Sequence, residues 1–240
     1  MTKTDKKKPP SKVDSTGKEI FEVKFAISRA ETARLLASLR HNTATPDQFS
    51  HARIKTIYFD DRMDTSFYES REGELFKRKY RLRVYMDRTE GARYSLEIKK
   101  RHNTVTSKVR ELIFEELPSG FRITSFHSLI RAFEEITGRP LFNLSSELPS
   151  IELFPDTVVF YERVRFDDRH ASVRYNVDTS IRVFPGPSTT EETVGEGLSL
   201  GHDVFEIKSV KPGVIPFFLK GLSLEPFSFS KFAWGKELLG

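Results

Sequence analysis

The sequence predicts an α+β fold in which an antiparallel sheet closes on itself and carries a few helices on its outer side. Segments that alternate apolar with charged residues recur along most of the 240 residues, whereas only a few stretches have helical periodicity. In at least six of these segments the charged positions are nearly all Arg, Lys or Glu. Their uniformity indicates that the charged faces converge inside a barrel.

Strands dominate the first half of the chain. Ser28 and Glu31 form a capping-box pair, which predicts that a helix begins directly after Ser28. An apolar run bounded by polar residues predicts each strand here, and the segment after Asp60 has no such pattern. The expected elements are strands at 19–26, 54–60, 76–86, 92–101 and 106–115, a helix at 29–40, a turn region at 61–70 and a hairpin turn at 87–91.

The second half begins with a clear amphipathic helix over 124–138. Its apolar stripe includes Leu129 and Phe133, and Gly138 is a suitable residue to end it. The Gly, Pro, Ser and Thr content of 185–201 predicts a loop. The other expected elements are strands at 157–167, 171–184 and 203–210, a short helix at 216–222 and a last helix near 229–239.

Charge is distributed unevenly along the chain. Residues 1–12 carry a net charge of +4 and residues 71–110 carry +8, which leaves −7 for the remainder of a chain whose formal charge is +5. Residues 1–18 lack hydrophobic periodicity and are expected to form a disordered basic tail, followed by a single domain over 19–240. Cations concentrated in one segment favour a local anion site, so nucleic acid is not an expected partner.

Composition excludes several classes of protein. The absence of cysteine excludes disulfides, cysteine nucleophiles and thiolate metal sites. No apolar run reaches the roughly 18–20 residues needed to cross a bilayer, and no secretory signal is recognisable. These features predict a cytoplasmic protein without a transmembrane segment.

Two patterns identify candidate site residues. The segment FKRKYRLRVY (76–85) places Lys77, Lys79, Arg81 and Arg83 on one face of a strand, where they repel one another unless an anion lies beside them. Three other strands share a Glu-x-Lys pattern, namely Glu22 with Lys24, Glu97 with Lys99, and Glu206 with Lys208. Lys and Arg bind phosphate, and carboxylates can hold a divalent metal that bridges to phosphate. The two patterns together therefore predict a metal-assisted phosphate site.

These motifs resemble the VTC domain, the polyphosphate polymerase domain within the triphosphate tunnel metalloenzyme (CYTH-like) superfamily. The matching stretches run from residue 21 to residue 232, almost the whole predicted domain. They are FEVKF (21–25), TIYFD (56–60), RKYRLRVY (78–85), EIKKR with KVR (97–101 and 108–110), YERV (161–164), RYNVD (174–178), FEIK (205–208) and SKF (230–232).

The resemblance implies a closed antiparallel eight-stranded β-barrel, the tunnel fold, with a few helices packed outside. It also implies which residues line the tunnel. The implied phosphate ligands are Lys24, Arg81, Arg83, Lys99, Lys108, Arg163, Arg174, Lys208 and Lys231. Glu206 is the implied principal ligand of Mn²⁺ or Mg²⁺, with Glu22 and Glu97 as further metal ligands. Arg81, Arg83, Lys99 and Glu206 are the implied catalytic residues.

The expected activity is metal-dependent phosphoryl transfer on ATP or another triphosphate, with a polyphosphate chain as the favoured acceptor. Transfer to water instead would make the protein a triphosphatase. A third alternative is a module that binds polyphosphate or nucleotide without reacting, although the presence of Glu22, Glu97 and Glu206 favours an enzyme. Binding of nucleic acid by 71–110 is disfavoured, because the cations lie on alternating positions of strands.

Overall fold

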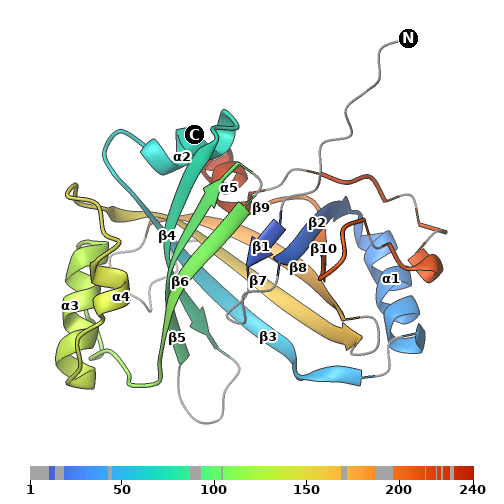
Figure 1. Cartoon of the computed structure of the whole chain (residues 1–240), viewed down its shortest axis with the longest axis horizontal. Helices are drawn as coiled ribbons and strands as arrows, with labels where there is room; N and C mark the ends of the chain where they lie inside the picture. Colours follow the sequence, from blue (N-terminus) through green and yellow to red (C-terminus); the bar gives the residue numbers. More distant parts are fainter. Residues whose placement is uncertain are drawn as a thin grey trace.

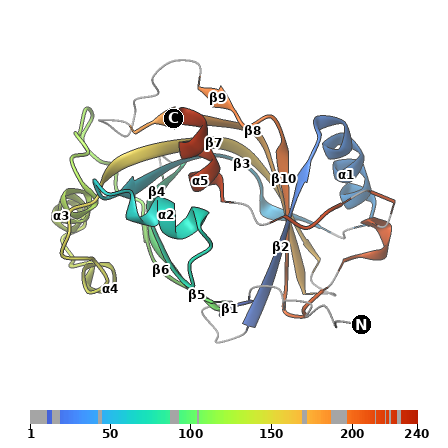
Figure 2. The ribbon, with the colours of Figure 1, turned by 90° about the horizontal axis from the view of Figure 1, so that it is seen from above.

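The computed structural model describes residues 11–13, 19–42, 45–86, 93–103, 105–168, 172–186, 197–213, 215–219, 221–222, 224–227 and 230–240. A large curled sheet forms the body, and helices lie on both of its sides (Figures 1 and 2). The strands are β1 (Ser11–Val13), β2 (Glu19–Ile27), β3 (Thr45–Asp60), β4 (Phe76–Tyr85), β5 (Arg93–His102), β6 (Val105–Ile113), β7 (Phe154–Asp168), β8 (Val173–Pro185), β9 (Leu198–Ser199) and β10 (Asp203–Ser209). The helices are α1 (Arg29–Asn42), α2 (Thr65–Arg71), α3 (Phe126–Thr137), α4 (Phe142–Ser145), the 3-10 turn η1 (Phe217–Leu219) and α5 (Lys231–Leu239).

The prediction of a closed barrel is wrong. Eight long strands pair antiparallel in the order β6-β5-β4-β3-β7-β8-β10-β2, and the edge strands β6 and β2 are not paired with each other in the part of the chain described here. The three-residue β1 lies between these edges, antiparallel to β2 but parallel to β6. The sheet is therefore an open, strongly curled half-barrel. Alternation of residue types indicates the face on which a side chain lies, but not whether two edge strands meet.

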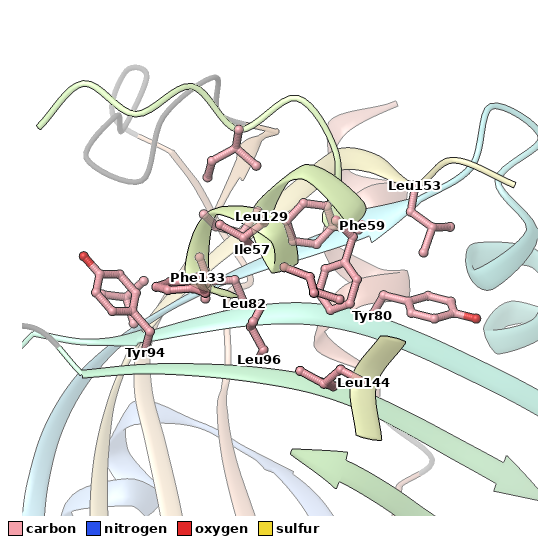
Figure 3. Packing of buried hydrophobic residues seen from close by; sticks show 14 of the residues in the cluster. Ile57, Phe59, Tyr80, Leu82, Tyr94, Leu96, Leu129, Phe133, Leu144 and Leu153 are labelled. Carbon is pink, nitrogen blue, oxygen red and sulfur yellow. The ribbon is translucent and has the colours of Figure 1, made fainter. Parts of the chain in front are cut away.

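The outer face of β3, β4 and β5 packs against α3 and α4 and forms the largest core cluster (Figure 3). Ser125 accepts a hydrogen bond from the amide of Ser128 at the start of α3, and Gly138 ends the helix in the left-handed conformation at φ 63°, as the sequence predicts. Between them the apolar stripe of the helix meets the sheet. Its partners in the cluster include Ile57, Phe59, Tyr80, Leu82, Tyr94 and Leu96.

A second core cluster lies under α1 at the other end of the sheet. Leu35 and Leu39 of α1 pack against Phe25 of β2 and Phe205 of β10, whose rings stack with centroids 5.7 Å apart. The predicted capping box is confirmed, since Ser28 N–H donates to Glu31 Oε2 at 2.8 Å and Glu31 N–H donates to Ser28 Oγ at 3.3 Å. Both clusters leave the inner face of the sheet to other residues.

The prediction that all helices lie outside is wrong for α5 and α2. Tyr58 lies on the inner face, because its neighbours Ile57 and Phe59 point outward into the α3 cluster. Phe232 of α5 stacks on Tyr58 with ring centroids 5.0 Å apart, and Phe67 of α2 joins the same cluster. Part of the inner face is therefore apolar and covered by helices (Figure 2).

The region 61–70, predicted as a turn, contains α2. The carboxylate of Asp60 accepts hydrogen bonds from the amides of Ser66 and Phe67, and Asp61 Oδ1 accepts from Thr65 N–H. These two acidic residues satisfy amides in the first turn of a seven-residue helix. The helix is too short to show a periodic pattern in the sequence, which explains why it was missed.

The other predicted strands and helices agree with the structure to within a few residues, except that β3 begins at Thr45, well before residue 54, and that the helix predicted at 216–222 is only the three-residue η1. Of the loop predicted at 185–201, residues 187–196 lie outside the described residues, and β9 lies within it. The hairpin turn at 87–91 lies outside the described residues. So do 1–10 and 14–18, and the disordered tail remains a prediction for them, although β1 falls inside the predicted tail. In the described part of the chain, none of the helices has the length and apolar character required to cross a membrane.

Candidate functional site

The cationic row of β4 points to the inner face of the curled sheet. Tyr80 and Leu82 of β4 are buried in the outer cluster under α3, so the residues between and beside them face the other way. Lys79, Arg81 and Arg83 consequently lie inside the curl, with Arg81 and Arg83 in register with Tyr58 and Thr56 of β3.

A buried carboxylate on β5 holds two of these cations. Glu97, whose side chain has no exposed surface, accepts hydrogen bonds from Arg81 Nε at 2.7 Å and Lys108 Nζ at 3.3 Å. Arg83 Nη1 lies 3.5 Å from Glu97 Oε1. Burial alone would raise the pKa of Glu97, but the charges of Arg81, Arg83 and Lys108 outweigh it and hold this pKa well below its usual value.

Two further carboxylates flank a lysine where β2 meets β10. Lys24 Nζ lies 3.1 Å from Glu22 Oε1 and 3.8 Å from Glu206 Oε2. Glu206 also accepts a hydrogen bond from Asn176 Nδ2 at 3.0 Å and forms an ion pair with Lys208. The Glu-x-Lys patterns of β2 and β10 therefore meet on one face, with Glu206 in register with Lys24.

A fourth carboxylate, Asp178 of β8, binds two more cations. Arg163 donates to both of its oxygens, from Nε at 2.6 Å and from Nη2 at 2.8 Å, and Lys231 Nζ donates to Oδ2 at 2.6 Å. Asp178 is buried, which would raise its pKa, yet Arg163 and Lys231 hold the pKa at about 2. This group joins β7, β8 and the first residue of α5.

The groups around Glu97, Lys24 and Asp178 lie close to one another inside the curl. Electrostatic interactions between residues on strands that are not neighbours in the sheet show this. Burial lowers the pKa of Lys99 well below its usual value, and Lys24 and Arg81 lower it further. Lys24 and Lys99 lie on β2 and β5, which do not pair. Glu206 of β10 acts on Lys99 of β5 and on Arg163 of β7, although β10 is a neighbour of neither strand.

We refer to these residues as the inner-face cluster. It contains nine cations and four carboxylates. The inner face therefore carries an excess of cationic groups, and these groups are only partly exposed to solvent. The members are Lys24, Lys79, Arg81, Arg83, Lys99, Lys108, Arg163, Lys208, Lys231, Glu22, Glu97, Asp178 and Glu206.

The structure brings together all the predicted site residues except Arg174. The side chain of Arg174 is 49% exposed and donates from Nε to Asp167 Oδ1 at 2.6 Å, which places it at the rim. Lys108 also lies toward the rim, with 36% of its side chain exposed, but it reaches Glu97.

Two members of the cluster, Lys79 and Asp178, are not among the ligands that the resemblance implies. Lys79 belongs to the cationic row of β4 that predicts a phosphate site, and the matching stretch RKYRLRVY contains it, but the implied set of phosphate ligands does not include it. Asp178 shares a strand face with Asn176, and this alternation was visible as well. No local pattern indicates that Asp178 binds Lys231, since the two residues are 53 positions apart.

The carboxylates of Glu22 and Glu206 are better suited to bind a divalent metal than the carboxylate of Glu97. Mg²⁺ and Mn²⁺ sites at phosphates typically use one or two carboxylates and take their other ligands from phosphate and water. Glu22 and Glu206 offer this pair, whereas Glu97 is enclosed by three cations. Among the described residues, no group of three or more acidic or His side chains is arranged to hold a metal ion. A metal here would therefore depend on phosphate oxygens for much of its coordination.

Substitutions distinguish metal binding by Glu206 from charge compensation by Glu97. We expect Glu206→Gln to lower the affinity for Mn²⁺, measured by calorimetry in the presence of tripolyphosphate, by at least about tenfold. Glu97→Gln is expected to leave Mn²⁺ affinity unchanged but to reduce thermal stability, because Arg81 and Arg83 lose their buried counter-charge. Equal loss of Mn²⁺ affinity in both variants would show that Glu97 also contacts the metal.

The fold and the site together define a curled antiparallel half-barrel with an excess of cations on its inner face. The family model of the VTC domain matches residues 19–239, nearly the whole chain, and the protein therefore belongs to the VTC domain family. VTC domains are associated with polyphosphate polymerase-type proteins, so membership is consistent with a polyphosphate-related function. No curated protein matches the chain.

Proposed function

We propose that the protein catalyses metal-dependent phosphoryl transfer on a triphosphate or polyphosphate chain bound at the inner-face cluster, and that it synthesises polyphosphate from ATP. The observation that carries this proposal is the position of Lys99. Lys24, Arg81 and Lys208 all lower its pKa, and Glu206 opposes them only in part. A polyanion beside Lys99 would relieve this repulsion between half-buried cations.

The residues divide the work by chemistry. Lys24, Lys99 and Lys208 supply compact charges for non-bridging phosphate oxygens, and the forked guanidinium groups of Arg81 and Arg83 can each donate two parallel hydrogen bonds. Glu97 fixes both forks in place, since it pairs with each of them. Phosphoryl transfer requires positioning and charge neutralisation more than a covalent nucleophile, and this set supplies both.

In the proposed reaction an oxygen at the end of the growing chain attacks the γ-phosphorus of ATP. The bond from that phosphorus to the bridging oxygen of ADP breaks, and the chain becomes longer by one phosphate. Arg81 and Arg83 neutralise charge on the transferred group, while Lys24 and Lys208 hold the neighbouring phosphates. A divalent metal held by Glu206 and Glu22 would supply Lewis-acid charge to the phosphate oxygens.

Product analysis tests this proposal. The protein is incubated with ATP and Mn²⁺, and the products are separated by length on a gel. Chains of many phosphates support the polymerase, whereas orthophosphate alone would replace it with a triphosphatase. ATP that remains intact while tripolyphosphate binds would indicate a binding module.

Anion binding is expected to take up protons. Burial lowers the pKa values of Lys79 and Lys99, and the surrounding cations lower them further, so part of the population is deprotonated at a pH above these lowered values. A bound polyanion favours the ammonium form and raises both pKa values, so protons are taken up from the buffer. The number of protons taken up on binding is measured by calorimetry with tripolyphosphate in buffers of different ionisation enthalpy.

Tripolyphosphate itself can release protons on binding, and substituted proteins distinguish this release from the proton uptake by lysine. Lys99→Met should reduce the uptake, whereas Lys100→Met should not. Lys100 is the next residue along β5 but pairs with Glu147 away from the inner-face cluster. Equal uptake in all three proteins would contradict the assignment of Lys99 to the phosphate site.

A further inference from the structure

Lys79 connects the inner-face cluster to α5. It lies on the inner face of β4, in register with Lys99 of β5. Its Nζ donates a hydrogen bond to Ser230 Oγ at 2.7 Å. Ser230 is the N-cap of α5, and the same hydroxyl oxygen accepts from the amide of Ala233 at 3.3 Å.

The other neighbours of Lys79 are unfavourable to its charge. The charges that act on it most strongly belong to Lys99, Lys24, Arg81 and Lys77, and all four lower its pKa in addition to the effect of burial. A neutral hydroxyl does little to offset four cations. Such a position is unfavourable for a lysine unless an anion shares it.

The first turn of α5 is attached to the cluster at a second point. Lys231, the residue after Ser230, binds Asp178 at 2.6 Å. In the core, α5 makes apolar contacts, in which Phe232 stacks on Tyr58 and Gly235 lies against Val183. Lys236, near the C-terminal end of the helix, pairs with Asp64 and Asp156, which do not belong to the inner-face cluster. Polar contacts of α5 with the site are therefore concentrated at its N-terminal end.

We propose that Lys79 is a further phosphate-binding residue, and that through its hydrogen bond to Ser230 it fixes α5 in place when the site is filled. This inference rests on the proposed function, since it requires a phosphate ligand at the inner-face cluster. An ammonium group has three donors, so Lys79 can bind a phosphate oxygen and Ser230 together.

The coupling follows from the charge of Lys79. A hydrogen bond from an ammonium group to a hydroxyl is stronger than one from a neutral amine. A bound anion favours the ammonium form, so it strengthens the contact between Lys79 and Ser230. The first turn of α5 is then held more firmly in the filled site than in the empty one.

Equilibrium binding of tripolyphosphate tests the first half of the proposal. We expect Lys79→Met to weaken binding by about tenfold or more, because a charge-assisted contact is lost. Lys100→Met, which removes the same charge from the opposite face of the sheet, should bind like wild type. Lys79→Met should fold well and melt higher than wild type in the absence of anion, since it removes a half-buried lysine whose charged form the surrounding cations repel.

The outcomes separate this inference from the proposed function. Absence of tripolyphosphate binding by wild type would contradict both. Wild-type binding that Arg81→Ala weakens and Lys79→Met leaves unchanged would overturn the role of Lys79 alone.

The fluorescence of Trp234 tests the second half of the proposal, the coupling of the filled site to α5. It is the only tryptophan of the chain and lies in α5, where its ring contacts Phe227 and His202. We expect tripolyphosphate to reduce quenching of Trp234 by acrylamide in wild type. Ser230→Ala retains Lys79 and should still bind tripolyphosphate, but this protection should be lost. Protection that persists in Ser230→Ala would overturn the coupling to α5.

Discussion

Arg81→Ala is expected to lower turnover of ATP into polyphosphate by about 10³-fold, in line with the contribution of arginines that stabilise phosphoryl transfer. Arg81 lies on the inner face, is fixed by Glu97 and acts on Lys99, so it is placed to neutralise the transferred group. The measurement is the initial rate of polyphosphate formation with ATP and Mn²⁺, at saturating concentrations of both.

Two variants control this experiment. Arg81→Lys keeps a charge beside Glu97 and should preserve thermal stability, but its rate should remain about 10²-fold below wild type because the forked donor is lost. Arg78→Ala removes a cation two residues before Tyr80, on the outer face of the same strand, and should react like wild type. A wild-type rate for Arg81→Ala, or an equal loss for Arg78→Ala, would remove Arg81 from the reaction.

Asp178→Asn is expected to lower the free energy of unfolding by about 3–5 kcal/mol. The substitution leaves Arg163 and Lys231 buried without their carboxylate, and uncompensated buried charge carries a cost of this size. For a chain of this length each kcal/mol shifts the melting temperature by roughly 2–4 °C. Denaturant unfolding and thermal melting measure the two quantities.

Asp167→Asn is the matched control for this prediction. Asp167 also pairs with an arginine between β7 and β8, at 2.6 Å, but the side chains are 25% and 49% exposed. An exposed pair contributes at most about 1 kcal/mol. Tripolyphosphate should restore part of the stability of Asp178→Asn, because it can replace the missing negative charge. Equal, small effects of the two substitutions would contradict a buried, charge-compensating role for Asp178.

The strands and their faces could be predicted from the sequence, because alternation is a local property. Lys24, Lys99 and Lys208 were each assigned to an inner face from the pattern of their own strands, and the structure places them in one cluster. The helices α1 and α3 were predicted well for the same reason, since their caps and stripes are local.

Features that depend on long-range contacts could not be predicted. Alternation in β2 and β6 does not show that their edges remain apart with β1 between them. The position of α5 on the inner face depends on Phe232 meeting Tyr58, far away in the sequence. The pairing of Glu97 with three cations also follows from the register of β4, β5 and β6, which the Glu-x-Lys pattern alone does not specify.

The most direct test of the central claim, that the cations of separate strands form one phosphate-binding site, is a crystal structure with tripolyphosphate and Mn²⁺. The account predicts phosphate oxygens within hydrogen-bond distance of Lys24, Arg81 and Lys99, and the metal at Glu206. Phosphate bound at the outer face, or an inner face that excludes it at saturating concentration, would contradict the account.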